Sequence, residues 1–204
     1  MKRYIYLKRI FDFTISLVGF IVLSPLFLLL AIVIKIESKG PVFFKQVRIG
    51  KGKKHFHILK FRSMRVDTPS EMPTHLLQHP EQYITKSGKF LRRTSLDELP
   101  QIINILKGEM SMIGPRPALW NQYDLIEKRD ACGANDVLPG LTGWAQINGR
   151  DELSIDLKAD YDAEYITRMS FLFDLHVLLR TIVSVVRREG VKEGVNKSSN
   201  ELSA

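Results

Sequence analysis

Two adjacent acidic residues, Asp97 and Glu98, stand just after a pair of arginines, Arg92 and Arg93, at the start of a short apolar pattern. The positive end of a helix dipole and nearby guanidinium groups both favour the ionised form of a carboxyl group. An ionised carboxylate can ligate Mg²⁺, and it can also attack phosphorus as a covalent nucleophile. The simpler alternative is that both acids only cap a helix.

The helix that would carry these acids is indicated by its periodicity. Residues 99–106 repeat apolar side chains at helical spacing, and Gly108 follows as the expected C-terminal stop. Ser95, three residues before Glu98, fits a capping box, with Asp97 as the alternative cap. Either arrangement places both carboxyl groups at the N-terminus of the helix.

Two further motifs suit phosphate or nucleotide binding. Pro115 and Pro117 fix the backbone on either side of Arg116, which suits a bidentate contact with phosphate, although a solvent-facing arginine on a rigid loop is an equally good interpretation. The segment from Pro139 to Arg150 combines three glycines with amides around Trp144. It could form a nucleotide pocket, while a tryptophan packed at a turn is the alternative.

The N-terminal region contains a membrane segment. The run from Phe13 to Ile34 is almost entirely apolar and would extend about 33 Å as a straight helix, enough to cross a bilayer core. At its midpoint Pro25 lacks an N–H and should kink the helix, and the Ser24 hydroxyl can bond a carbonyl one turn back. The alternatives are a kinked single-pass anchor and a re-entrant helix. Basic residues on both flanks favour the re-entrant form, because such residues tend to stay in the cytoplasm.

The rest of the chain contains weaker signals. Residues 42–48 and 55–62 are predicted to form a β-hairpin, and residues 67–87 a loop with at most short helices. Apolar side chains recur at helical spacing from Phe171 to Arg188, which predicts an amphipathic helix. This helix either lies in the membrane interface or covers the core. The polar tail is predicted to be disordered.

Composition limits the kinds of partner. Lys and Arg total 30 against 22 Asp and Glu, which gives a net charge of +8 and favours anionic partners such as phospholipid, nucleotide, phosphate or nucleic acid. A length of 204 residues suits one compact domain. The single cysteine, Cys132, forms no internal disulfide and fits a reducing compartment.

Seven motifs, taken together and in order, closely resemble the bacterial sugar transferase family, whose monotopic members are polyprenyl-phosphate phosphoglycosyl transferases. The resemblance extends from about Lys8 to Gly190 and is more specific than any single motif. The motifs are Lys8-Arg9-Ile10-Phe11-Asp12, Ser24-Pro25, Lys60-Phe61-Arg62-Ser63-Met64, Thr94-Ser95-Leu96-Asp97-Glu98-Leu99-Pro100-Gln101, Lys107-Gly108-Glu109-Met110-Ser111, Gly114-Pro115-Arg116-Pro117 and Pro139-Gly140-Leu141-Thr142-Gly143-Trp144-Ala145-Gln146.

The resemblance implies an α+β fold consisting of one membrane-embedded monotopic domain with a re-entrant helix, a small β-hairpin and several amphipathic helices. We expect the re-entrant helix and its basic flank at residues 1–38, with the break at Ser24 and Pro25. The catalytic domain would occupy residues 39–190 at the cytoplasmic face of the bacterial inner membrane, and residues 191–204 would form the disordered tail.

The resemblance also implies the reaction. By analogy with the family, Asp97 attacks the β-phosphate of a UDP-sugar with the help of Mg²⁺, releases UMP and holds the phosphosugar as an acyl phosphate. Undecaprenyl phosphate then takes the phosphosugar, in the first membrane step of capsule, exopolysaccharide or other surface glycan assembly. Glu98 would help Asp97 bind the metal or would orient the nucleophile.

Four basic residues match basic positions of the family and are expected to bind substrate. Arg92 and Arg116 would hold phosphate oxygens, while Lys60 and Arg150 have no assigned substrate group. Expected partners are the UDP-sugar, undecaprenyl phosphate and membrane lipid, with downstream glycosyltransferases and a second copy of the chain as further candidates.

Two other functions would use parts of the same sequence. A membrane-anchored nucleic-acid binder would use the positive charge, but no recognisable DNA- or RNA-binding module accompanies it, so nucleic acid is not an expected partner. A non-catalytic scaffold of glycan assembly would keep the anchor and helices without needing Asp97 and Glu98.

Overall fold

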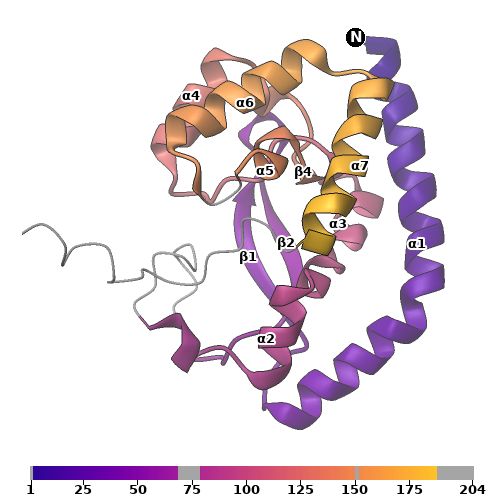
Figure 1. Cartoon of the computed structure of the whole chain (residues 1–204), viewed down its shortest axis with the longest axis vertical. Helices are drawn as coiled ribbons and strands as arrows, with labels where there is room; N and C mark the ends of the chain where they lie inside the picture. The colour runs from indigo at the N-terminus through magenta and orange to yellow at the C-terminus, as the bar shows by residue number, and fades with distance from the viewer. Residues whose placement is uncertain (1, 69–78, 150–151, 188–204) are drawn as a thin grey trace, which may run out of the picture.

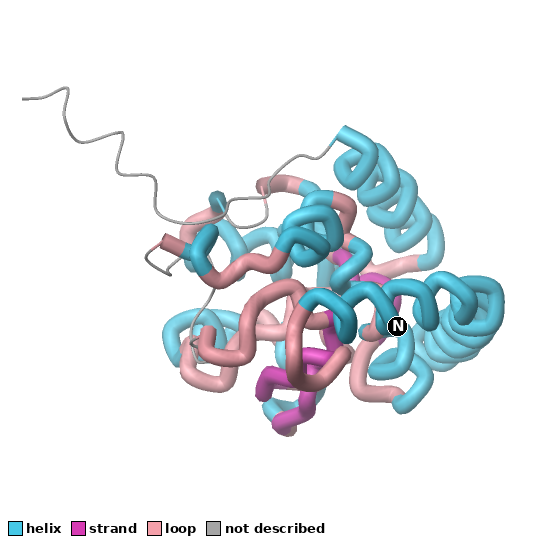
Figure 2. Tube along the Cα trace, turned by 90° about the horizontal axis from the view of Figure 1, so that it is seen from below, coloured by secondary structure: helices cyan, strands magenta, loops and turns pink. Residues whose placement is uncertain are grey.

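The computed structural model describes residues 2–68, 79–149 and 152–187. Helices form most of the outline, and the strands form two small sheets between them (Figure 1, Figure 2). The expected mixture of helices and strands is therefore confirmed. The α-helices are α1 (Lys2–Glu37), α2 (Lys86–Arg93), α3 (Gln101–Lys107), α4 (Tyr123–Ala131), α5 (Trp144–Ile147), α6 (Ile155–Arg168) and α7 (Phe171–Arg187). The strands are β1 (Phe43–Ile49), β2 (His55–Phe61), β3 (Ser111–Ile113) and β4 (Gly140–Thr142), and the 3₁₀ turns are η1 (Lys51–Lys53), η3 (Pro80–Gln82), η4 (Leu96–Glu98) and η5 (Ala134–Asp136).

Helix α1 runs along one side of the molecule and bends in its lower half (Figure 1). It contains Pro25, which cannot donate to the carbonyl of Ile21 four residues earlier. The hydroxyl of Ser24 donates to that same carbonyl at 2.8 Å, as the sequence predicted. Helix α1 therefore stays continuous through the proline, and in the described part of the chain it is the one helix long and apolar enough to cross a membrane.

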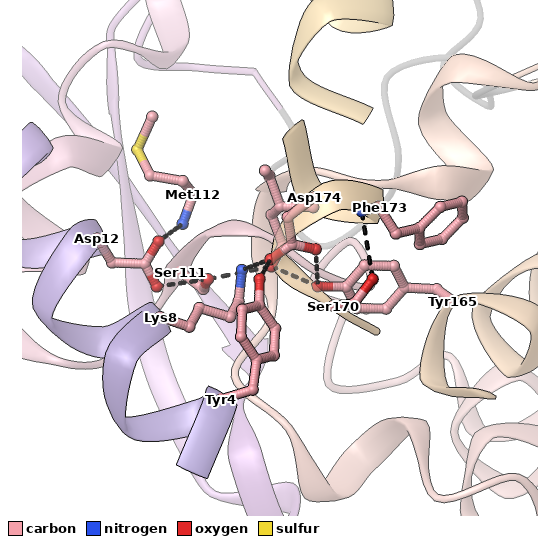
Figure 3. A network of polar contacts seen from close by, with 10 residues as sticks. Tyr4, Lys8, Asp12, Ser111, Met112, Tyr165, Ser170, Phe173 and Asp174 are labelled. Carbon is pink, nitrogen blue, oxygen red and sulfur yellow. Dashed lines mark hydrogen bonds and ion pairs between the residues drawn. The ribbon is translucent and has the colours of Figure 1, made fainter. Parts of the chain in front are cut away.

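The N-terminal half of α1 is held to the domain by buried polar contacts (Figure 3). Tyr4 and Lys8 each approach a carboxylate oxygen of Asp174 on α7 at 2.5 Å, and Tyr165 donates to the other oxygen at 2.9 Å. One turn further along, Asp12 accepts hydrogen bonds from the Ser111 hydroxyl and from the next backbone N–H in β3. The basic N-terminal flank is thus part of the packed structure.

The C-terminal half of α1 is held by apolar packing. Phe27, Leu30 and Ile34 are buried against Phe61 at the end of β2 and Leu91 of α2. The rings of Phe27 and Phe61 meet edge to face with centroids 5.2 Å apart. Both halves of α1 therefore pack on the same body, while most of the remaining apolar side chains of the helix are exposed.

The predicted hairpin is confirmed. Strands β1 and β2 are antiparallel, with Phe43 opposite Phe61 and Ile49 opposite His55. Phe56 and Ile58 point inward from β2 and pack against Ile105 of α3. The hairpin therefore supports α3, which follows the acidic pair.

Helix α7 covers part of the core, as one of the two sequence alternatives proposed. Phe173 and Val177 are buried with Tyr165 of α6 and Ile113 of β3. The opposite side of α7 is also apolar and is exposed, with Leu172 75% and Leu179 56% accessible. Core packing therefore explains only one face of this helix.

The capping prediction was wrong. Ser95 has a left-handed backbone conformation and makes no side-chain capping bond to η4, and α3 begins after Pro100. The Glu98 side chain instead forms ion pairs outside its own turn. Gly108 does end α3 in a left-handed conformation, as predicted.

Helix α2 was not foreseen from the sequence. Thr85 caps it by accepting from the N–H of Gly88, and Glu37 at the end of α1 accepts from the N–H groups of Lys86 and Ser87. The predicted disordered tail and residues 69–78 of the predicted loop lie outside the described residues.

Candidate active site

The acidic pair lies in the 3₁₀ turn η4, between α2 and α3. Asp97 and Glu98 are 7% and 9% exposed, so both carboxyl groups are largely withdrawn from water. The flanking residues Leu96 and Leu99 pack against the cluster that contains Phe27 of α1. The turn therefore packs on the same apolar cluster as the C-terminal half of the N-terminal helix.

Glu98 is bound by two of the predicted basic residues. One of its oxygens, Oε1, accepts from Lys60 Nζ at 2.7 Å and from Arg116 Nη2 at 3.0 Å. Burial lowers the pKa of the Lys60 ammonium, and the nearby carboxylates of Glu98 and Asp97 offset this only in part. The site thus combines two largely buried carboxylates with two cations.

Arg116 is held from behind by a buried ion pair. Its backbone carbonyl accepts from Arg129 Nη1 at 2.8 Å, and Arg129 also binds Asp162 through Nε at 2.8 Å and Nη2 at 2.6 Å. Arg129 and Asp162 are 4% and 1% exposed. The rigid loop predicted from the two prolines is therefore anchored to α4 and α6, and Arg116 points to Glu98 and not only to solvent.

The two glycine-containing motifs meet at the backbone. Gly114 donates to the carbonyl of Thr142 at 2.9 Å, which extends the parallel pairing of β3 with β4. A side chain on Gly140 would place its Cβ 2.1 Å from the nitrogen of Gly114, and one on Gly143 would lie 2.0 Å from the Gly114 oxygen. Only glycine permits this approach, which brings β4 and α5 next to Arg116.

Trp144 is packed, as the alternative interpretation of its motif proposed. Its indole N–H donates to Glu164 at 2.7 Å, and its ring contacts Tyr161 and Phe173. Arg168 lies over the same ring at 5.7 Å from the centroid. Trp144 therefore joins α5 to α6 and α7.

The remaining predicted residues have different positions. Arg92 lies in the last turn of α2, and its carbonyl accepts from the N–H of Ser95 at 3.2 Å, next to the acidic turn. Arg93 lines a cavity beside Glu98. Arg150 lies outside the described residues. Arg129 and Asp162 were not identified from the sequence as part of the site. The available signal was that Asp162 lies at helical spacing from Tyr165, on the buried face of α6.

The acidic pair suits a Mg²⁺ ion that is held partly by substrate phosphates, and not a metal ion held by protein side chains alone. Among the described residues, no three His, Cys, Asp or Glu side chains gather as a metal cluster. Mg²⁺ is commonly held by one or two carboxylates together with substrate phosphates, which two adjacent buried acids can provide. Glu98 Oε1 already accepts from two cationic groups, so a metal ion bound through that oxygen would compete with Lys60 and Arg116.

A cavity of about 300 Å³ adjoins the site. One part of its wall comes from Arg93 at the end of α2, from Glu98 in the turn before α3, and from Arg116. The rest comes from β3, β4, α5 and one side of α7. The cavity thus connects the charged site with a helix whose outer face is exposed and apolar.

A model of the bacterial sugar transferase family matches residues 3–188. The chain belongs to the bacterial sugar transferase family. This bacterial sugar transferase is therefore an enzyme that transfers a sugar-containing group, and its long apolar α1 fits association with a membrane.

Several curated relatives are similar over nearly the whole of the bacterial sugar transferase. A protein from Bacillus subtilis (strain 168) named uncharacterized sugar transferase EpsL is 40% identical over 92% of this chain and 91% of its own length. Proteins named UDP-glucose:undecaprenyl-phosphate glucose-1-phosphate transferase are 42% identical in Escherichia coli (strain K12) and 39% identical in Xanthomonas campestris pv. campestris. They align with 86% and 90% of this chain, which spans 39% of each of those two relatives.

Proposed function

We propose that this sugar transferase moves a sugar 1-phosphate from a UDP-sugar to undecaprenyl phosphate and releases UMP, as the first membrane step of a surface polysaccharide. Asp97 attacks the β-phosphorus, the bond from that phosphorus to the bridging oxygen breaks, and UMP leaves. A phosphate oxygen of the acceptor then attacks the same phosphorus and displaces Asp97. The names of the relatives support both substrates.

The position of the acidic turn carries this proposal. Leu96 and Leu99, next to the acidic pair, pack against the apolar cluster in which Phe27 of α1 meets Phe61 of β2 and Leu91 of α2. A helix with this many exposed apolar side chains belongs in lipid, and a polyprenyl acceptor stays in lipid. The structure therefore supports a reaction in which a nucleophile at the bilayer surface meets an acceptor that remains in the bilayer.

The chain's own residues supply positioning and charge neutralisation, on which phosphoryl transfer mainly depends. Lys60 and Arg116 bring positive charge to the turn through Glu98, and Arg92 and Arg93 bring more. Mg²⁺, held by Asp97 and Glu98 with substrate phosphates, would neutralise charge on the diphosphate when bound.

The nucleophile is tested by trapping. Wild-type protein incubated with donor alone should release UMP in a single burst and gain the mass of a phosphosugar on the peptide that contains Asp97. Asp97→Asn should do neither, while Asp67→Asn, the same change at an exposed carboxylate paired with Arg65, should keep both. An active wild-type enzyme that shows no adduct, or turnover by Asp97→Asn, would exclude the covalent step.

We also propose that α1 enters and leaves the bilayer at the cytoplasmic face. Its N-terminal half is bound to α7 through Asp174, and its C-terminal half packs on β2 and α2 through Phe27. A helix spanning from one face to the other would draw the charged groups of this body into the hydrocarbon, which is costly. Phe171 of α7 contacts Phe11 of α1, ring centroids 5.5 Å apart, so the exposed apolar face of α7 can also reach lipid.

Topology is tested by labelling in intact cells. In a background in which Cys132 is replaced, single cysteines at Arg3 and at Lys45 should both resist a membrane-impermeant maleimide and should both react after permeabilisation. Labelling of only one of them in intact cells would show that α1 spans the membrane.

A further inference from the structure

The cavity beside the acidic turn has two kinds of wall. Arg93, Glu98 and Arg116 bring charged groups to it, whereas Leu178 and Val185 of α7 bring apolar side chains. A ligand that fits both walls has an anionic end and an apolar body, because each part then meets a matching surface.

Three polar side chains on the α7 side of the cavity, those of Thr142, Gln146 and Thr181, form hydrogen bonds within the protein. The hydroxyls of Thr142 and Thr181 lie 2.8 Å apart and are hydrogen-bonded to each other, and Thr181 also donates to the carbonyl of Val177. The amide nitrogen of Gln146 donates to the carbonyl of Leu141 at 3.0 Å, and its amide oxygen is buried and has no hydrogen-bond partner among the described residues. This wall therefore offers a ligand mainly apolar contact, which suits a hydrocarbon better than a uracil or a sugar.

The same wall borders the lipid-facing side of α7. Val185 lines the cavity and is also 42% exposed, and its neighbours on the outer face, Leu179 and Ile182, are more exposed still. A hydrocarbon chain can thus pass from the outer face of α7 to the cavity along a continuous apolar surface.

We propose that this cavity binds the polyprenyl phosphate acceptor, with the phosphate beside Arg116 and Arg93 and the first isoprene units against Leu178 and Val185. The inference rests on the proposed function, since it assigns the acceptor of that reaction to one side of the acidic turn. It makes α7 part of the acceptor site and leaves the nucleotide of the donor on the other side of the turn.

The experiment compares tryptophans at two neighbouring leucines of α7. Leu178→Trp fills the cavity, whereas Leu179→Trp makes the same change on the outer face, where the leucine is 56% exposed. Two steps are measured separately for each variant: the UMP burst with donor alone, and kcat/KM for undecaprenyl phosphate. Leu178→Trp should keep the burst and lower kcat/KM for the acceptor at least about tenfold, because it displaces several buried CH₂ groups. Leu179→Trp should resemble wild type in both.

A photoreactive prenyl phosphate carrying a diazirine gives a second measurement on unaltered protein. It should label the α7 peptide, and undecaprenyl phosphate should compete for that labelling. The inference is overturned if the label lies outside α7. It is also overturned if Leu178→Trp lowers the UMP burst as much as it lowers kcat/KM for undecaprenyl phosphate, or if it changes neither quantity. Absence of any burst in wild-type enzyme would count instead against the proposed function.

Discussion

The buried ion pair of Arg129 and Asp162 allows the size of a loss of folding stability to be predicted. The two side chains are 4% and 1% exposed, and Asp162 accepts two hydrogen bonds from the guanidinium. Asp162→Asn leaves the positive charge buried without a counter-ion. Removing one partner from such a pair costs about 3–5 kcal/mol, which is a large part of the stability of an ordinary protein. The midpoint of urea unfolding in detergent, followed by the fluorescence of Trp120 and Trp144, should therefore fall sharply.

A matched control joins the same two helices. Lys128 of α4 also pairs with Asp156 of α6, but these side chains are 45% and 70% exposed. Asp156→Asn should leave the midpoint unchanged, since exposed pairs often contribute nothing measurable. The double variant Arg129→Met with Asp162→Leu should lose less stability than Asp162→Asn, because no charge remains buried. Equal shifts for the two single Asp→Asn variants would refute the reasoning from burial.

Three further predictions concern other parts of the molecule. Burial lowers the pKa of Lys60, so its ammonium loses a proton at a pH below the ordinary 10.5. The value of kcat/KM should therefore fall as the pH rises through that lowered pKa. Lys60→Arg should move this fall to higher pH, because arginine stays charged. Gly88→Ala places Cβ 1.9 Å from the Ser63 oxygen and should lower stability by about 1–3 kcal/mol in the same urea assay, whereas Gly19→Ala meets its nearest neighbour at 4.0 Å and should not. Asp174→Asn should speed amide hydrogen exchange in the first turns of α1, measured by mass spectrometry; unchanged exchange would show that the Asp174 contacts do not hold that end.

The sequence predicted the elements whose signals are local. The hairpin follows from alternation and a glycine-rich turn, and α7 follows from its apolar repeat. The bond from Ser24 to Ile21 follows from the carbonyl that Pro25 leaves unpaired. In each case the residues that determine the structure lie within a few positions of one another.

Elements that depend on distant contacts were missed. Helix α2 has eight residues, includes a glycine and is stabilised by Glu37, about 50 positions earlier in the chain. The capping box was a sound local pattern, but Glu98 bonds to Lys60 and Arg116, which lie 38 and 18 positions away. The resemblance to the family identified Lys60, Glu98 and Arg116 as candidates. Only the structure shows that Lys60 and Arg116 bind the same carboxylate oxygen of Glu98.

The attachment of α1 to α7 affects the order in which the protein is made. Tyr4 and its partner Asp174 are separated by 170 positions, so at ordinary elongation speeds α1 leaves the ribosome about 10–30 s before that partner. During this interval α1 can already pack on Phe61 and Leu91, but Lys8 has no Asp174 carboxylate beside it. The C-terminal half of α1 can therefore dock before the N-terminal end, which is held by Asp174 only when synthesis of the domain is nearly finished.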